Sequence, residues 1–92
     1  MTDQRYDNDL FESLPQGRDL RTYVDEGRPM NHFLMALVRN DLLECVGRAD
    51  PRNLAALDSY CMWLRSYAPP GCFGDREKVA AWIEHKGLAG TT

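Results

Sequence analysis

Three cysteines and two histidines are the residues of this 92-residue chain that could supply a nucleophile, an acid–base group or a soft metal ligand. Cys45, Cys61 and Cys72 lie 16 and 11 residues apart, and neither spacing gives the close ligand pair of a zinc site. His32 and His85 stand at no spacing from a serine or cysteine that is typical of nucleophilic catalysis. The sequence also lacks a phosphate-binding loop, a His-Glu-x-x-His motif and a paired-carboxylate signature. We therefore expect no catalytic residue, no metal site and no cofactor, and predict that the protein is not an enzyme.

The number of cysteines limits their chemistry further. An odd count without a secretion signal indicates reduced thiols. Free cysteine commonly behaves as a small buried hydrophobe, and Cys45 and Cys61 lie in stretches with helical periodicity. We expect both of them to be buried. Cys72 lies in a loop rich in proline and glycine, where burial and exposure both remain open.

Asn40 and Asp41 form the second candidate site. They interrupt the most apolar stretch of the chain, "LVRNDLLECV", although both are poor helix formers. A helix over residues 30–46 would carry apolar side chains almost all round and would be buried on most sides. Buried polar groups need hydrogen-bond partners, and buried carboxylates need charged or backbone donors. The pair would then either anchor neighbouring loops, through backbone amides or an arginine, or face a ligand.

The elements that position these residues are helices. Apolar periodicity and capping signals predict helices over residues 16–26, 30–46, 51–67 and 76–86. Gly27 would end the first helix, and Asp75 would cap the last. We predict an all-α fold, a small bundle of about four helices around a central hydrophobic second helix. Residues 1–14 would form an acidic tail, 15–88 the helical domain, and 89–92 a C-terminal tail.

Charge is distributed unevenly along the chain, whose net charge is −3. Within residues 1–16, four acidic residues oppose one arginine, whereas the remainder carries ten acids and ten bases. A neutral body argues against nucleic-acid binding, which needs a basic face, so a DNA-binding regulator is less favoured than the two function classes given below. Nine of the eleven bases are arginine, which pairs bidentately with carboxylates and phosphates. An arginine-lined anion site therefore remains open.

Several short motifs between residues 20 and 87 resemble a family of small uncharacterised proteins from bacteriophages and prophages. Its Phe-Leu-x-Ala-Leu-x-Asn-Asp-Leu helix is similar to "FLMALVRNDL", in which two residues instead of one separate Leu37 from Asn40. The matching positions are Tyr23, Gly27, Pro29, Phe33, Leu34, Ala36, Leu37, Asn40, Asp41, Leu42, Ala49, Asp50, Asn53, Pro69, Phe73 and Gly74. Phe73 stands where this family usually carries tryptophan. The resemblance implies a phage origin, but it implies no activity.

Two function classes follow from these observations. We expect a phage accessory protein that binds a host or phage protein and modulates it, in host takeover or counter-defence. The alternative is an oligomer that binds or sequesters a small ligand such as a nucleotide, with arginines near Asn40 and Asp41 lining the pocket. No apolar run approaches 18 residues, and the acidic N-terminus does not resemble a signal peptide. We therefore expect no membrane contact and a cytoplasmic location, the host cytoplasm if a phage encodes the protein.

An interface is predicted from apolar residues that lie off the main helical stripes. Met62 and Trp63 point away from the apolar stripe of the helix over 51–67, and Phe73 follows in the next loop. Burying them against another copy would give a homodimer, the commonest oligomer. The alternative is that the segment around Leu10 and Phe11 folds back and covers them within one chain.

Overall fold

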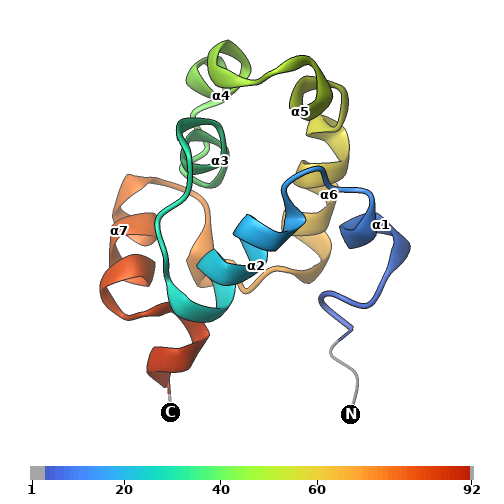
Figure 1. Cartoon of the computed structure of the whole chain (residues 1–92). Coiled ribbons are helices and arrows are strands. Elements are labelled where there is room, and N and C mark those ends of the chain that lie inside the picture. Colours follow the sequence, from blue (N-terminus) through green and yellow to red (C-terminus); the bar gives the residue numbers. More distant parts are fainter. Residues whose placement is uncertain (1–3, 92) are drawn as a thin grey trace.

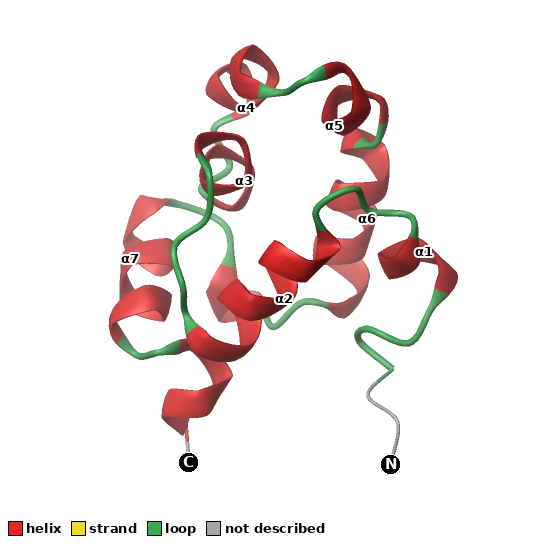
Figure 2. Ribbon diagram, in the orientation of Figure 1, coloured by secondary structure: helices red, strands yellow, loops and turns green. Residues whose placement is uncertain are grey.

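Helices make up all the regular structure in residues 4–91, the part of the chain that this computed structural model describes (Figure 1; Figure 2). The α-helices are α1 (Asp9–Glu12), α2 (Gly17–Glu26), α3 (His32–Val38), α4 (Leu42–Arg48), α5 (Pro51–Ala55), α6 (Leu57–Tyr67) and α7 (Arg76–Glu84). Two short 3-10 helices, η1 (Pro70–Cys72) and η2 (Gly87–Thr91), follow α6 and α7. The predicted all-α fold is confirmed, but these residues form seven α-helices instead of about four.

The larger number arises because two predicted helices are divided and because α1 forms within the predicted N-terminal tail. The helix expected over 30–46 stops at Val38 and resumes at Leu42 as α4, because Asn40 adopts a left-handed backbone conformation with φ of 61°. The helix expected over 51–67 changes direction at Ala56, between α5 and α6. The first break matters more, since it removes the long central helix of the predicted bundle.

The other predicted helix ends agree closely with the structure. Gly27 follows α2 in the left-handed conformation, and its amide donates to the Tyr23 carbonyl at 2.8 Å. The carboxylate of Asp75 accepts from the Lys78 amide at 2.8 Å and caps α7. Asp50 caps α5 in the same way, from the position before Pro51.

Aromatic side chains form the centre of the core and use their polar ends to join distant segments. Tyr23, Tyr60 and Trp63 are completely buried. The Tyr23 hydroxyl donates to the Cys72 carbonyl at 2.6 Å, and the Tyr60 hydroxyl donates to Asn53 Oδ1 at 2.7 Å. Satisfying these hydroxyls removes the cost of burying them. The core therefore lies between α2, α3 and α6, with η1 and α7 closing one side.

The N-terminal segment packs on this core, although residues 1–14 were predicted to form a tail. The ring of Tyr6 lies 6.1 Å from that of Trp63, centroid to centroid, and the ring of Phe11 lies 5.4 Å from it. The indole nitrogen of Trp63 donates to the Arg5 carbonyl at 2.8 Å, and the Tyr6 hydroxyl donates to Asp25 at 2.5 Å. Residues 4–14 thus belong to the folded domain; residues 1–3 lie outside the described residues.

The C-terminal residues also pack on the domain instead of extending from residue 89 as a tail. Helix η2 lies against α2, where Gly87 meets Gly27. A Cβ atom on Gly87 would lie 2.6 Å from the Val24 carbonyl oxygen, which is closer than real Cβ contacts come. Gly87 also has a φ of 60°, so glycine is required there twice over. Residue 92 lies outside the described residues.

The molecule is thin, with extents of 37 × 30 × 17 Å. Since packed helices lie about 8–10 Å apart, the shortest dimension holds about two layers of helix. Helix α3 nevertheless lies within the core, and its residues Phe33–Val38 are buried. Helix α4 lies further out and exposes part of its apolar surface.

Candidate interaction surface

The break between α3 and α4 is built by two polar residues that act on different helices. Asn40 ends α3: its amide donates to the Leu37 carbonyl at 3.1 Å, and the Asp41 amide donates to the Ala36 carbonyl at 3.0 Å. These two bonds, with a left-handed residue between helix and turn, form a Schellman motif in which asparagine takes the place of the usual glycine. The pair therefore closes the last turn of α3.

Asp41 then begins α4. Its carboxylate accepts from the Glu44 amide at 3.4 Å, which is longer than the 2.8 Å of the corresponding caps of α5 and α7. Glu44 stands at the position of a capping box, but its own carboxylate pairs with Arg48 at 2.7 Å. The cap of α4 is thus the weakest of these three.

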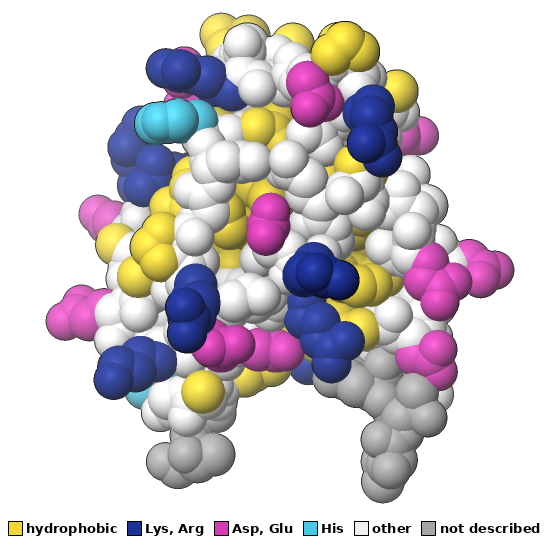
Figure 3. Space-filling model, viewed as in Figure 1, with side chains coloured by type: hydrophobic (Ala, Val, Ile, Leu, Met, Phe, Trp, Pro, Cys, Tyr) yellow, Lys and Arg dark blue, Asp and Glu magenta, His cyan; other side chains and the backbone are white. Residues whose placement is uncertain are grey.

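The break turns the apolar side chains of α4 outward. Leu42 is 63% exposed, Leu43 85% and Val46 40%, whereas Cys45 is buried against the core. The prediction that the apolar residues of 30–46 are buried on most sides therefore holds for α3, where Phe33–Val38 are buried, and is wrong for α4. On α5, Leu54 is 47% exposed. We call these four exposed residues (Leu42, Leu43, Val46 and Leu54) the α4–α5 face. In Figure 3, yellow apolar atoms lie among white and charged ones at the top of the molecule, where α4 and α5 are.

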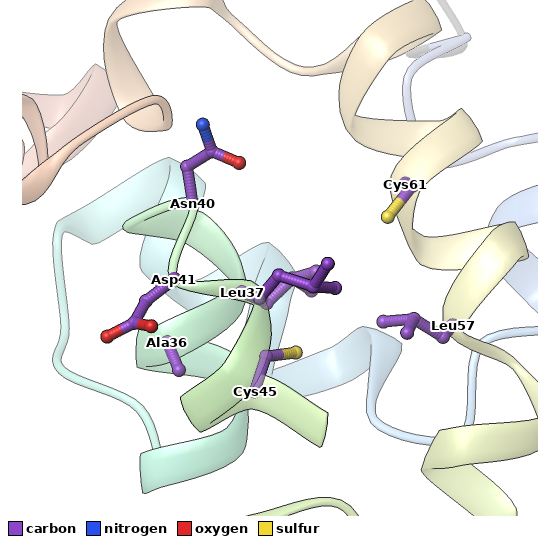
Figure 4. Close-up of a pocket in the computed structure, with 8 residues that line it drawn as sticks. Ala36, Leu37, Asn40, Asp41, Cys45, Leu57 and Cys61 are labelled. Atoms are coloured by element: carbon purple, nitrogen blue, oxygen red, sulfur yellow. The ribbon is translucent and has the colours of Figure 1, made fainter. Parts of the chain in front are cut away.

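An apolar groove adjoins this face, between the α3–α4 segment and α6. It consists of two hollows of about 60 and 240 Å³ that share Leu37, Asn40 and Cys61. Figure 4 shows Leu37 and Cys45 pointing from one side, and Leu57 and Cys61 from the other, toward the same space. The other residues that line the two hollows are Ala36, Asp41, Leu42, Leu64, Arg65, Phe73 and Gly74.

Of the three residues predicted to form an interface, two are accessible and one is buried. Phe73 lines the groove, and Met62 is 51% exposed on α6. Trp63 was predicted to belong to the interface, and that prediction is wrong for the folded chain, because Tyr6 and Phe11 cover it completely. The segment around Leu10 and Phe11 does fold back, but over Trp63 and not over Met62.

Comparison of the chain with models of protein families, with curated proteins and with solved structures gives no match. The resemblance to phage proteins therefore stays a prediction. Within residues 4–91, no helix combines the length and the apolar character needed to span a bilayer.

The environments of the three cysteines do not favour the reactive thiolate form. Cys45 is buried as predicted, Cys72 is buried as well, and Cys61 is exposed, contrary to the prediction. Cys61 is exposed because its side of α6 faces the groove and not the core. Burial raises the pKa of all three thiols, that of Cys72 to about 12, so little thiolate forms near neutral pH. Residues 4–91 contain no group of three or more His, Cys, Asp or Glu side chains that could hold a metal ion.

The sequence contained a signal for this site that the helical periodicity concealed. Asparagine is the second choice after glycine for ending a helix, and an N-cap residue followed three positions later by glutamate marks the start of the next one. The segment Asn40-Asp41-Leu42-Leu43-Glu44 has this order. Read in this way, the two polar residues predict a helix end and a helix start, and the outward turn of α4 follows from them.

Proposed function

We propose that the protein is a non-enzymatic binding protein that holds an apolar helix of a partner protein on the α4–α5 face and in the adjoining groove. The observation that supports this most directly is the exposure of Leu42, Leu43 and Val46 on a single helix. Burying a leucine or valine side chain fully is worth about 1.5–3 kcal/mol, so three such residues could supply the apolar centre of an interface.

The shape of the surface favours a helical partner. The groove lies beside α4 and is lined mainly by apolar side chains. Amphipathic helices of partner proteins commonly bind in such grooves through apolar residues spaced at i, i+3, i+4 and i+7. Arg65 at the groove's edge is exposed, and its side chain makes no hydrogen bond or ion pair with residues 4–91. A partner helix with an acidic residue opposite Arg65 would complement this edge.

The biological setting of the proposal rests on the phage resemblance. In that setting the chain acts in the host cytoplasm as an accessory protein, and the partner is a host or phage protein whose activity changes on binding. Nothing in the proposal requires catalysis.

The test uses one substitution in the exposed face. Leu43→Asp changes the most exposed apolar side chain of α4 and should leave the fold intact, whereas Ala80→Asp makes the same change on exposed α7. The wild-type chain and the Ala80→Asp variant should capture the same protein from host lysate, and the purified partner should bind both with equal affinity in calorimetry. Leu43→Asp should lose that binding. Equal binding by Leu43→Asp would remove this face from the interface.

A further inference from the structure

On the other side of the Asn40–Asp41 turn lies a charged cleft between α3, α4 and the start of α7. Two hollows of about 320 and 570 Å³ adjoin there and share Arg39, Asp41 and Arg76. Both hollows are open to solvent, and the larger one is shallow. Small-molecule sites usually measure about 300–1,000 Å³, so the cleft has room for a ligand that stays partly exposed. Its other lining residues are His32, Ala36, Asn40, Glu44, Asp75 and Glu77. In Figure 3, basic side chains and a histidine gather where α3, α4 and α7 meet.

Neither arginine of the cleft has a partner in the part of the chain that the structure describes. Neither the Arg39 nor the Arg76 side chain makes a hydrogen bond or ion pair with any residue from 4 to 91, whereas Arg48 pairs with Glu44 at 2.7 Å. The Nε atom of Arg39 is moreover shielded from solvent. A guanidinium group cannot lose its proton, and buried donors in folded proteins almost always have an acceptor. The two guanidinium groups beside the cleft therefore carry donors for which residues 4–91 provide no acceptor.

The carboxylates around the cleft are largely engaged elsewhere. Asp41 and Asp75 cap α4 and α7, and the Glu44 carboxylate is held by Arg48. The hydrogen bond and the charge of Arg48, and more weakly the charges of His32 and Arg76, lower the pKa of Glu44, so this group stays ionised. Carboxylates beside two arginines disfavour a purely anionic ligand but can accept hydrogen bonds from hydroxyl or amino groups.

We propose that this cleft binds a small phosphorylated molecule of the nucleotide type, with Arg39 and Arg76 on its phosphate and with Asn40 and Asp41 accepting from its hydroxyl or amino groups. Two guanidinium groups from different helices can bind a phosphate through parallel, charge-assisted hydrogen bonds. The cleft shares Ala36, Asn40 and Asp41 with the groove, but Arg39 and Arg76 lie outside both the groove and the α4–α5 face. Substitution of either arginine therefore tests this site apart from the proposed function.

Calorimetric titration of the full chain with AMP, ATP, adenosine and inorganic phosphate tests the proposal. AMP or ATP should bind, and adenosine should bind at least about tenfold more weakly because it lacks the phosphate. Arg76→Ala, at an exposed position, should weaken the binding of AMP by about tenfold or more. Arg39→Lys should weaken it as well, since lysine keeps the charge but loses the paired donors. Arg52→Ala removes an exposed arginine of α5 outside the cleft and should leave the affinity unchanged.

Three results would overturn the site. The first is no heat of binding for AMP or ATP at millimolar concentration. The second is equal affinity of the wild-type chain and Arg76→Ala. The third is a loss of affinity in Arg52→Ala as large as in Arg76→Ala, which would indicate general attraction of anions to a basic surface. Circular dichroism of each variant establishes that it has folded before it is titrated.

Discussion

Asn40 and Asp41 are adjacent in the chain but belong to different helices: Asn40 closes α3, and Asp41 opens α4. The turn they form also separates two surfaces of different character. Both residues line the apolar groove beside α6 and the arginine cleft beside α7. Two short side chains therefore set the direction of α4 and the position of both candidate sites.

Replacing Asn40 tests the turn directly. Asn40→Gly should leave the free energy of unfolding unchanged or raise it, because glycine adopts a positive φ at no steric cost. Asn40→Val should lower it by about 1–2 kcal/mol or more, since a β-branched residue is strained in this conformation. Urea unfolding of both variants measures the difference. In a continuous helix over 30–46 the order would be reversed, and glycine would be the more destabilising change.

The caps of α4 and α7 should differ in strength. Asp75→Ala should lower the free energy of unfolding by about 1–2 kcal/mol, and Asp41→Ala by less, about 0.5–1 kcal/mol. The reason is the longer bond of Asp41, 3.4 Å to the Glu44 amide against 2.8 Å from Asp75 to the Lys78 amide. Urea unfolding under identical conditions gives the comparison. If Asp41→Ala lowers the free energy of unfolding more than Asp75→Ala does, the Asp41 carboxylate must have a stabilising role besides capping α4.

Much of this architecture can be predicted from local sequence. Glycine and aspartate signals placed α2 and α7 within two residues of their ends, because a helix cap depends only on neighbours in the chain. The docking of the N-terminal segment could not be predicted in this way. The hydrogen bond between Trp63 and Arg5 joins residues 58 positions apart, and no local pattern specifies which aromatic rings meet. For the same reason the exposure of Cys61 and the burial of Cys72 became clear only in the fold.

Two glycines should respond to alanine substitution in opposite directions. Gly47 lies within α4 with open space around its Cα, so Gly47→Ala should raise the free energy of unfolding by about 0.5–1 kcal/mol. Gly87 has a φ of 60°, and a Cβ there would meet backbone atoms of α2. Gly87→Ala should therefore lower stability by at least about 1–2 kcal/mol. Thermal and urea unfolding of the pair test whether η2 is packed as described; a neutral Gly87→Ala would contradict that packing.

Alkaline pH should destabilise the fold through its buried thiol. Burial raises the pKa of Cys72 from 9.0 to about 12. Between these values the thiol ionises in the unfolded chain but stays protonated in the folded one, so the unfolded state binds fewer protons. Stability should be unaffected by this group below pH 9 and should fall as the pH rises toward 12. The buried hydroxyls of Tyr6 and Tyr23, whose pKa values are also raised by burial, act in the same direction.

Urea unfolding at neutral pH and near pH 10 measures this effect. Cys72→Ala should be less stable than the wild-type chain at neutral pH, because it leaves a cavity in the core. Its stability should nevertheless fall less steeply with rising pH. Cys61→Ala is the matched control at an exposed thiol. If the free energy of unfolding of Cys72→Ala falls with rising pH as steeply as that of the wild-type chain, the loss of stability at alkaline pH comes from the tyrosines alone.

Removal of residues 1–14 should expose the aromatic surface that the N-terminal segment covers. Trp63 would lose the rings of Tyr6 and Phe11 and the acceptor at Arg5. Large apolar surfaces left open on a small domain promote association, so the truncated chain should be oligomeric or insoluble. Light scattering should show the full chain as a monomer at every concentration, because its own first residues fill this site. If the full chain is instead a dimer, and Leu43→Asp dissociates it, a second copy binds on the α4–α5 face. If the truncated chain stays monomeric with unchanged stability, the packing of the N-terminal segment over Trp63 is refuted.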